Sequence, residues 1–320
     1  MNADGSGFAK LTNNPATDVY PSWSADGRKI AFESNDALVT NRGTNKVIYV
    51  MNADGTGQKR LTDTGVDSYP AWSPDGSKIA FGSGRAGGSH DIFIMDADGG
   101  NVRKLTNNGR INFDPFWSPD GTKVAFISQS GENSEIYTVN IDGTGEKALT
   151  NSNTSVGSAD WSPDGRRIVF QDSRGVGVMN ANGTEQSTLF PGGTGPAWSP
   201  DGQKITFVGP DGEIATIGVD GSDLTLVTNT PDLLVGYPDW QPITGAGTGN
   251  ADTVTADTGT RGTGNASGTG AGQGNGDRTA IPDTTSGRSL PETGGLALLA
   301  PAIGLLLISG AVAQLVVRPR

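Results

Sequence analysis

Acidic, amide and tyrosine side chains recur a few positions ahead of tryptophan in this chain of 320 residues. Side chains of these types can bind a cation, a sugar or the basic end of a peptide, and a pair of carboxylates can cleave a glycosidic bond. For any single one of them, the simpler interpretation is a hydrogen bond at a strand start or contact with solvent. The candidate ligand-binding residues are Asp18, Tyr20, Asp67, Tyr69, Asn112, Asp114, Asp160, Tyr237 and Asp239.

Other catalytic chemistries lack the residues that they need. The chain has no Cys and one His, which argues against thiol nucleophiles, cysteine zinc sites and histidine-pair metalloproteases, and weakens any Ser/His/Asp triad. We expect that histidine, His90 in the Gly-rich segment GRAGGSHD, to be a solvated surface residue. The segment 96–99 has the look of the start of a calcium loop, but the Glu that completes such a loop is missing. We therefore predict no catalytic residue, no cofactor and no metal site.

The charge balance excludes one class of partner. The formal net charge is −11 and the pI is about 4.5. Binding to nucleic-acid phosphates requires clustered Lys and Arg side chains. The sequence therefore predicts no nucleic-acid partner.

An internal repeat must position the candidate residues. The six tryptophans lie 37 to 49 residues apart, and each of the first five is followed by Ser, then Pro or Ala, then Asp-Gly. Pro, Asp and Gly in this order favour a tight turn between two strands. The five copies read WSADGRKIAF, WSPDGSKIAF, WSPDGTKVAF, WSPDGRRIVF and WSPDGQKITF.

The rest of each unit predicts two more strands. Runs rich in β-branched and aromatic residues, such as KVIYVM at 46–51 and DIFIM at 91–95, lead into turns of the Asn-Ala-Asp-Gly type and then into Leu-Thr. Four short antiparallel strands repeated every 40 to 45 residues are typical of a β-propeller blade. No segment before residue 290 has a sustained helical period, so a helical solenoid is excluded.

These signatures resemble those of the TolB-like six-bladed β-propellers, whose repeats are of the WD type, over residues 1–243. The resemblance implies the fold, and it does not imply an activity because propellers carry many functions. Five complete blades are present, marked by Trp23, Trp72, Trp117, Trp161 and Trp198. We thus expect an all-β propeller with five complete four-stranded blades and a partial sixth.

The partial blade would be built from both ends of the propeller. Residues 237–242 supply its first strand and residues 1–12 its last, while its two middle strands are missing. Met1 begins MNADGSG, which nearly repeats MNADGTG at 51–57, so we suspect that an internal methionine of a longer protein stands at position 1. The alternative is a five-bladed ring with ragged ends.

The composition changes after the propeller. Residues 244–289 contain mostly Gly, Thr, Ala, Asp, Asn and Ser, with no aromatic side chain, and cannot bury a core. We expect a disordered, flexible linker there. An apolar run at 296–317 follows, long enough for a transmembrane helix, and the chain ends in Arg318-Pro-Arg320.

The segment between the linker and the apolar run reads Leu290-Pro291-Glu292-Thr293-Gly294. Together with the run and the basic end, it looks like the LPxTG sorting signal of Gram-positive surface proteins. The resemblance implies that a sortase cleaves between Thr293 and Gly294 and joins Thr293 to peptidoglycan. Residues 290–320 would then form a sorting signal that is only briefly in the membrane. The alternative is an ordinary single-span anchor with a chance LPETG.

We therefore expect a protein covalently attached to the Gram-positive cell wall, with sortase and peptidoglycan as partners. Its propeller would be a non-enzymatic binding module for an extracellular protein, peptide or glycan. The alternative is an extracellular polysaccharide hydrolase or lyase that uses channel carboxylates. A third interpretation is a spacer without a ligand.

Overall fold

The computed structural model describes residues 1–3, 6–7, 9–35, 46–87, 89–151, 155–228, 237–242 and 316–317. The expected linker at 244–289, the LPETG segment at 290–294 and the first twenty residues of the expected span at 296–317 lie outside these ranges. Within the described ranges, the structure has no helix with the length and apolar character that a membrane crossing requires.

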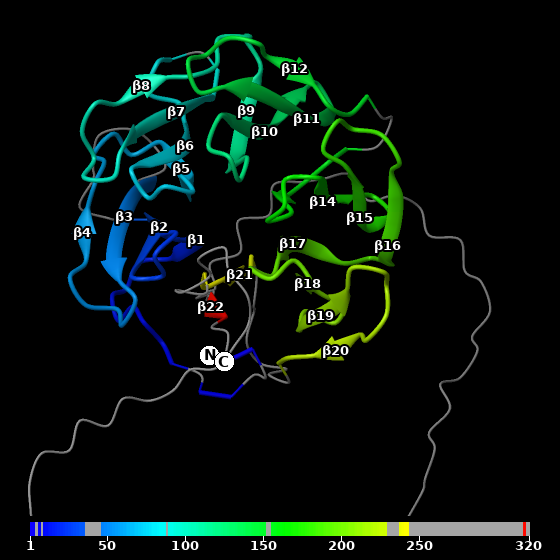
Figure 1. Cartoon of the computed structure of the whole chain (residues 1–320). Helices are drawn as coiled ribbons and strands as arrows, with labels where there is room; N and C mark the ends of the chain where they lie inside the picture. Colours follow the sequence, from blue (N-terminus) through cyan, green and yellow to red (C-terminus); the bar gives the residue numbers. More distant parts are fainter. Residues whose placement is uncertain are drawn as a thin grey trace, which may run out of the picture. The chain divides into compact units, whose positions relative to one another are not determined.

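Five four-stranded antiparallel sheets surround a central axis, and each uses its strands in chain order (Figure 1). Blade 1 contains β1 (Asp18–Trp23), β2 (Lys29–Asn35), β3 (Lys46–Asn52) and β4 (Lys59–Arg60), and blade 2 contains β5 (Asp67–Trp72), β6 (Lys78–Ser83), β7 (Asp91–Asp96) and β8 (Arg103–Lys104). Blade 3 contains β9 (Ile111–Trp117), β10 (Lys123–Ser130), β11 (Asn133–Asn140) and β12 (Lys147–Ala148). Blade 4 contains β13 (Ala159–Trp161), β14 (Arg167–Asp172), β15 (Gly175–Asn180) and β16 (Ser187–Pro191), and blade 5 contains β17 (Thr194–Trp198), β18 (Lys204–Val208), β19 (Ile214–Gly218) and β20 (Thr225–Leu226).

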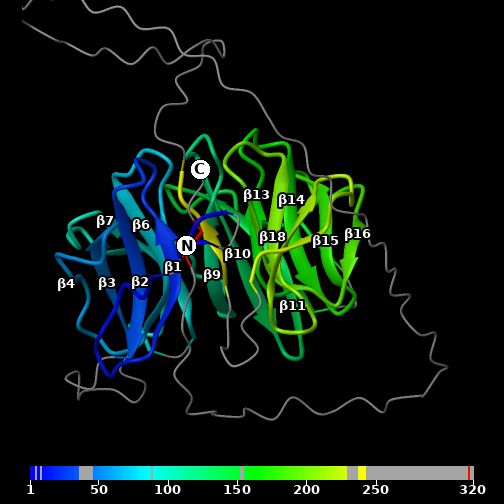
Figure 2. The same ribbon diagram turned by 90° about the horizontal axis from the view of Figure 1, so that it is seen from below.

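The first strand of each blade lies nearest the axis and the fourth lies at the outside of the ring (Figure 1). Seen from the side, the strands run from one face of the ring to the other (Figure 2). The predicted propeller of four-stranded blades is thereby confirmed.

The turn that follows each tryptophan forms as the sequence predicts. In blade 2, the Ser73 hydroxyl donates to Asp75 at 2.6 Å, the Ser77 amide donates to the same oxygen at 3.0 Å, and Gly76 has a φ of 69°. The hydroxyl of Ser73 and the amide of Ser77 hold the pKa of the exposed Asp75 carboxyl at about 2. Asp75 is therefore an ionised turn residue, and the equivalent aspartates make the same contacts.

The core lies between neighbouring blades rather than within one. Ile48 and Val50 of blade 1 pack against Trp72, Ile79 and Phe81 of blade 2, and the next pair of blades repeats the pattern. Phe81 and its equivalents in blades 3, 4 and 5 are among the largest fully buried side chains. Each blade is therefore stabilised by the faces of its neighbours, since two apolar sheet faces exclude water from each other.

Both ends of the propeller meet in the space between blade 5 and blade 1. Here β21 (Asp239–Trp240) pairs in parallel with β22 (Val316–Val317), the last two residues of the expected membrane span. Met1 is buried against Ala197, Ile214 and Trp240. Five blades are complete, and among the described residues the middle strands of a sixth blade are not found.

Contacts across this space close the ring. The carboxylate of Asp239 accepts a hydrogen bond from the Trp23 amide at 2.9 Å, and the Gln241 side chain donates to the Gly27 carbonyl at 2.8 Å. These bonds join residues more than 200 positions apart in the chain, because one partner lies at each end of the propeller. The first blade is thereby attached to the last described strand of the propeller.

A second periodic contact joins the outer edges of the blades. In three of the turns between third and fourth strands, the Gly packs closely against the backbone carbonyl of the Leu that follows the outer strand of the preceding blade. The pairs are Gly99 and Leu61, Gly143 and Leu105, and Gly183 and Leu149. Gly55 rests in the same way on Leu11, so the N-terminal segment takes the place of an outer strand ahead of blade 1. A side chain at these glycines would strike backbone atoms of the neighbouring blade.

Gly183→Ala should lower the free energy of unfolding more than Gly121→Ala does. Both glycines have positive φ, which costs Ala about 1–2 kcal/mol. A Cβ on Gly183 would lie 2.0 Å from the Leu149 carbonyl oxygen, whereas one on Gly121 meets nothing within 4 Å. We expect a further loss of about 1–3 kcal/mol for Gly183→Ala in urea unfolding of the full chain. Equal losses would contradict this packing of blade 4 on blade 3.

Candidate functional site

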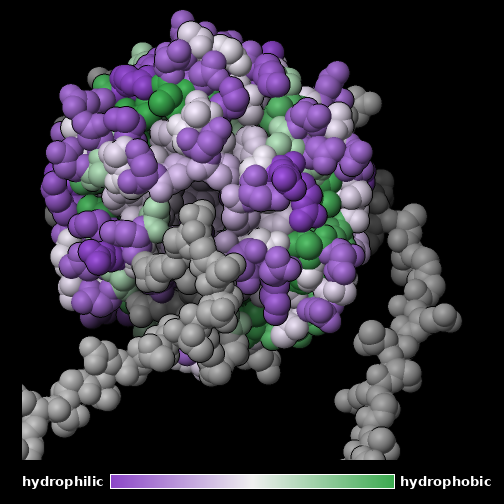
Figure 3. Space-filling model, in the orientation of Figure 1, coloured by the Kyte–Doolittle hydropathy of each residue, from purple (hydrophilic) through white to green (hydrophobic). Residues whose placement is uncertain are grey.

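A cavity of about 420 Å³ lies on the axis of the ring, where the first strands of the blades meet. Six of the nine candidate residues line this central cavity: Tyr20, Tyr69, Asp114, Asp160, Tyr237 and Asp239. On the face drawn in Figure 3, hydrophilic side chains lie along the part of the central hollow that is in view. The spacing relative to tryptophan thus identified residues that lie far apart in the chain and share one cavity.

An unusual backbone conformation accompanies the residues of the central cavity. The residue three positions before tryptophan has positive φ in five of the six repeats: Tyr20 (55°), Tyr69 (55°), Asp114 (51°), Gly195 (58°) and Tyr237 (51°). In blades 1, 2, 3 and 5 the pairing of the first and second strands shifts at this point, which is a β-bulge. A residue other than Gly in this conformation costs about 1–3 kcal/mol, and such residues cluster at functional sites, although Asn101, Glu185 and Asp223 adopt it in outer turns of this chain.

The tyrosines form one cluster on the cavity wall. The ring centroid of Tyr20 lies 4.2 Å from that of Tyr69 and 4.3 Å from that of Tyr237. Burial raises the pKa of each of the three phenols, and the negative charge that the others would carry raises that of Tyr20 further. The cluster is therefore neutral near pH 7 and offers hydroxyl groups and ring faces.

The carboxyl groups form the second part of the wall. The Asp160 carboxylate accepts from the Trp198 amide at 2.8 Å, as Asp239 does from Trp23. Burial raises the pKa of Asp114 to about 7, that of Asp160 to about 6 and that of Asp239 to about 7, and the charge of Asp160 raises the other two further. Each is half-buried because one side faces the cavity and protein surrounds the rest.

The described residues that line the central cavity include no Lys, Arg or His. The three carboxyl groups therefore have no cationic partner on the wall. Nor do the described residues contain a cluster of three carboxylate or imidazole groups that could hold a metal ion. What the cavity offers is negative charge that appears around neutral pH, beside aromatic rings.

The other three candidate residues do not line the central cavity. Asp18 is buried and accepts from the Ser34 hydroxyl at 2.6 Å. Asp67 is fully buried, accepts from Ser83 and pairs with Arg85 at 2.8 Å. The reason is the bulge: it interrupts the alternation of side chains along the strand between these residues and the cavity-lining ones.

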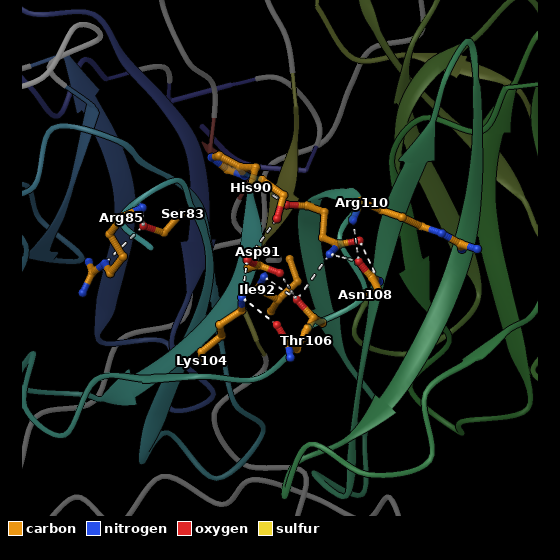
Figure 4. Close-up of polar contacts among 12 residues, drawn as sticks. Ser83, Arg85, His90, Asp91, Ile92, Lys104, Thr106, Asn108 and Arg110 are labelled. Atoms are coloured by element: carbon orange, nitrogen blue, oxygen red, sulfur yellow. Dashed lines mark hydrogen bonds and ion pairs between the residues drawn. The ribbon is translucent and has the colours of Figure 1, made fainter. Parts of the chain in front are cut away.

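Asn112, the third of these residues, belongs to a buried network between blades 2 and 3. Its amide donates to the Thr106 hydroxyl at 3.3 Å. That hydroxyl donates to Asp91, which is fully buried and pairs with Lys104 at 2.7 Å (Figure 4). Asn112 thus stabilises the contact between two blades. This role could not be predicted from local sequence, because it depends on a contact between two blades.

The surroundings of His90 and Glu33 were not predicted from the sequence. His90 is not a solvated surface residue: it is half-buried, and its Nδ1 lies 2.9 Å from the Asn112 carbonyl oxygen (Figure 4). Glu33, which the sequence analysis did not single out, is buried and pairs with Lys46 at 3.0 Å, and its charge raises the pKa of Tyr69 and Tyr237. No local pattern marked Glu33, because its effect on Tyr69 depends on how blades 1 and 2 meet.

Comparison with known proteins agrees with this architecture. The model of the PD40 family of TolB beta propeller domains matches residues 35–131 and 109–242. A search of curated protein sequences gives no match.

Solved structures of other propellers are similar in fold. TolB from Agrobacterium tumefaciens is 22% identical, with a TM-score of 0.59 over 68% of this chain and 83% of that one. TolB from Acinetobacter baumannii is 24% identical, with a TM-score of 0.60 over 68% of this chain and 56% of that one. An oligogalacturonate lyase in complex with manganese is 15% identical, with a TM-score of 0.52 over 68% of both chains. The chain thus spans little more than half of the Acinetobacter protein, and at these identities the similarity shows the fold alone.

The carboxyl groups of the cavity should make stability fall as the pH rises from 5 to 8. A carboxyl group with a higher pKa in the folded state stabilises that state below the unfolded pKa, and this stabilisation is lost as the pH rises through the folded value. Asp160→Asn keeps an acceptor for the Trp198 amide and removes the charge. We expect it to gain on the order of 1–2 kcal/mol relative to wild type between pH 5 and pH 8 in urea unfolding. The control Asp75→Asn should differ from wild type by a constant amount, and a constant difference for Asp160→Asn would refute the assignment.

Proposed function

Because the chain belongs to the family of TolB β-propeller domains, we propose that it is a non-enzymatic recognition module whose central cavity binds a basic segment of a protein or peptide. The observation that carries the proposal is the wall of the cavity. It gathers three carboxyl groups and three tyrosines, and no described residue of the wall neutralises the carboxyl groups.

A cationic group suits this wall in two ways. Its charge would lower the pKa of Asp114, Asp160 and Asp239, so a ligand cation and three ionised carboxylates would stabilise one another. The tyrosine faces attract a cation as well. A lysine side chain or a chain N-terminus fits a volume of about 420 Å³.

The second candidate function is cleavage of a polysaccharide. It is favoured by one observation: Asp114 and Asp160 combine raised pKa values with a shared cavity, as acid and base pairs do in glycosidases. Against it, Asp160 and Asp239 are already engaged by the amides of Trp198 and Trp23. We therefore assign these carboxylates to ring closure and ligand binding.

We place the module on the Gram-positive cell surface, attached to peptidoglycan through Thr293. The support is the order of the C-terminal features: a Gly- and Thr-rich linker, the LPETG segment, an apolar run and a basic end. A linker of 46 residues spans roughly 35–40 Å as a flexible coil, which would hold the propeller away from the site of attachment.

Neutralising the cavity should weaken binding of a basic peptide. We expect the full chain to bind an oligolysine peptide more tightly at pH 8 than at pH 5, because the carboxyl groups ionise over this range. Asp114→Asn and Asp160→Asn should each raise the Kd about tenfold in calorimetric titration at pH 8. The control Asp211→Asn removes the same charge at an exposed turn and should leave the Kd unchanged. Equal losses in all three variants would contradict a site in the cavity, and polysaccharide cleavage lost in Asp114→Asn would favour the second candidate.

Thr293→Ala should abolish attachment to the wall in a Gram-positive host that carries a sortase. The wild-type chain should be released by muramidase digestion, with a C-terminal peptide that ends at Thr293 and carries a peptidoglycan amine in mass spectrometry. Thr285→Ala, a change of the same kind within the linker, should behave as wild type. Recovery of wild-type chain with residues 294–320 intact from the wall fraction would contradict sorting.

A further inference from the structure

A second cavity lies between blades 1 and 2, on the side of the turns that follow the tryptophans. Its volume is about 650 Å³, and its wall includes Ala25, Lys29, Lys59, Trp72 and Ala97. We call it the inter-blade cleft. The candidate residues of the central cavity are not part of it, although Ala25 and Trp72 border both.

The inter-blade cleft is larger than its counterpart between blades 2 and 3. That counterpart has a volume of about 330 Å³, and its wall has Pro74 and Ile141 where the inter-blade cleft has Ala25 and Ala97. Ala25 is the only departure from Trp-Ser-Pro-Asp-Gly among the five complete units. Ala25 thus departs from the repeat, whereas Ala97 is the usual residue of its turn and Ile141 is an exception there.

One lysine of the cleft lacks the side-chain partner that equivalent lysines have in blades 2 and 3. Lys29 has no side-chain partner among the described residues, whereas the equivalent Lys78 pairs with Asp96 at 2.8 Å and Lys123 with Asn140 at 2.5 Å. The indole N–H of Trp72 has no partner either, but its nitrogen is buried, so Trp72 contributes its ring to the wall rather than a donor. The indole N–H groups of Trp23, Trp161, Trp198 and Trp240 also lack a partner. By contrast, the indole N–H of Trp117 donates to the Ala71 carbonyl at 3.0 Å. Lys59 reaches across from blade 1 to the Asp98 carbonyl at 3.2 Å.

Acceptors lie beside these donors. Asp26, Asp75 and Asp98 belong to the wall, and serine hydroxyls and turn amides lower the pKa of the first two, so both are ionised near pH 7. The floor is apolar, with Val50 and Leu61 next to the Trp72 ring. Two lysines and three aspartates nearly cancel in charge, so neither an anion nor a cation is favoured strongly.

We propose that the inter-blade cleft binds a neutral pyranose unit of a glycan. The hydroxyl groups of a neutral sugar both donate and accept, so they match a wall that offers lysine donors beside carboxylate acceptors. Its C–H face can pack on the apolar floor. This site is separate from the peptide site of the central cavity and would let one propeller hold two chemically different ligands.

The test uses the full chain labelled with ¹⁵N-tryptophan, whose six indole N–H signals are followed by NMR. The probes are N-acetylglucosamine, glucose, galactose and mannose, and the Trp72→Phe variant assigns the Trp72 signal. We expect at least one of these sugars to shift that signal with a Kd in the millimolar range, as is usual for a single small ligand with few contacts.

The decisive variant is Ala25→Pro combined with Ala97→Ile, which gives the cleft the side chains of its smaller counterpart. Because these residues already occupy equivalent positions in the fold, the variant should fold, and its other five indole signals report whether it does. We expect it to lose at least about tenfold in sugar affinity, and Lys29→Gln to lose a few-fold. Asp114→Asn, in the central cavity, should bind the sugar as wild type does.

Three results would overturn the proposal. One is the absence of a shift at Trp72 with all four sugars at 50 mM or so, a concentration that would reveal a Kd in the millimolar range. Another is unchanged affinity in the Ala25→Pro, Ala97→Ile variant. The third is binding of glucuronate or glucosamine alone, which would show that the cleft selects a charge rather than a neutral sugar.

Discussion

The structure depends on contacts that let each blade use its neighbour as the other half of its core. No single sheet is stable alone, because the apolar residues of one blade are buried only by the next one. At the inner edge, a side chain just ahead of tryptophan accepts the amide of the following tryptophan: Ser22 from Trp72, Asp160 from Trp198 and Asp239 from Trp23. The hydrogen bond between Trp23 and Asp239 closes the ring, since it joins the two ends of the propeller.

The same contacts create the chemistry of the central cavity. Asp160 and Asp239 must face inward to reach the next tryptophan amide, and burial in that position raises their pKa values. A fold built only for stability would use Ser22-like side chains here, which accept the same bond without a charge. Carboxyl groups and strained tyrosines at these positions reduce stability, and such a cost is typical of sites retained for binding.

The sequence predicted the repeat well because each unit carries its own turn chemistry. Ser73, Asp75 and Gly76 form their turn through local contacts, so the residue types alone determine it. The separation of Tyr20 from Asp18 could not be predicted in the same way. Regular alternation would place the two on one face of the strand, and only the positive φ at Tyr20 sends Asp18 to the interior of the blade. Likewise, the pairing of His90 with Asn112 depends on how two blades meet, which no local pattern encodes.

Departures from the repeat are therefore the most informative residues of the chain. Where a unit keeps the repeated residues, side chains of that unit can pair with one another, as Lys78 pairs with Asp96. Where a unit departs from it, as at Ala25, the wall of the cleft lacks the Pro side chain that its counterpart has at Pro74. A fold made of near-identical units has no unique site by default, since the cleft between two of its five complete blades has counterparts between the others. Function must then arise from asymmetry, and in this propeller the asymmetry is concentrated in the tyrosines and carboxyl groups of the central cavity and in the cleft between its first two blades.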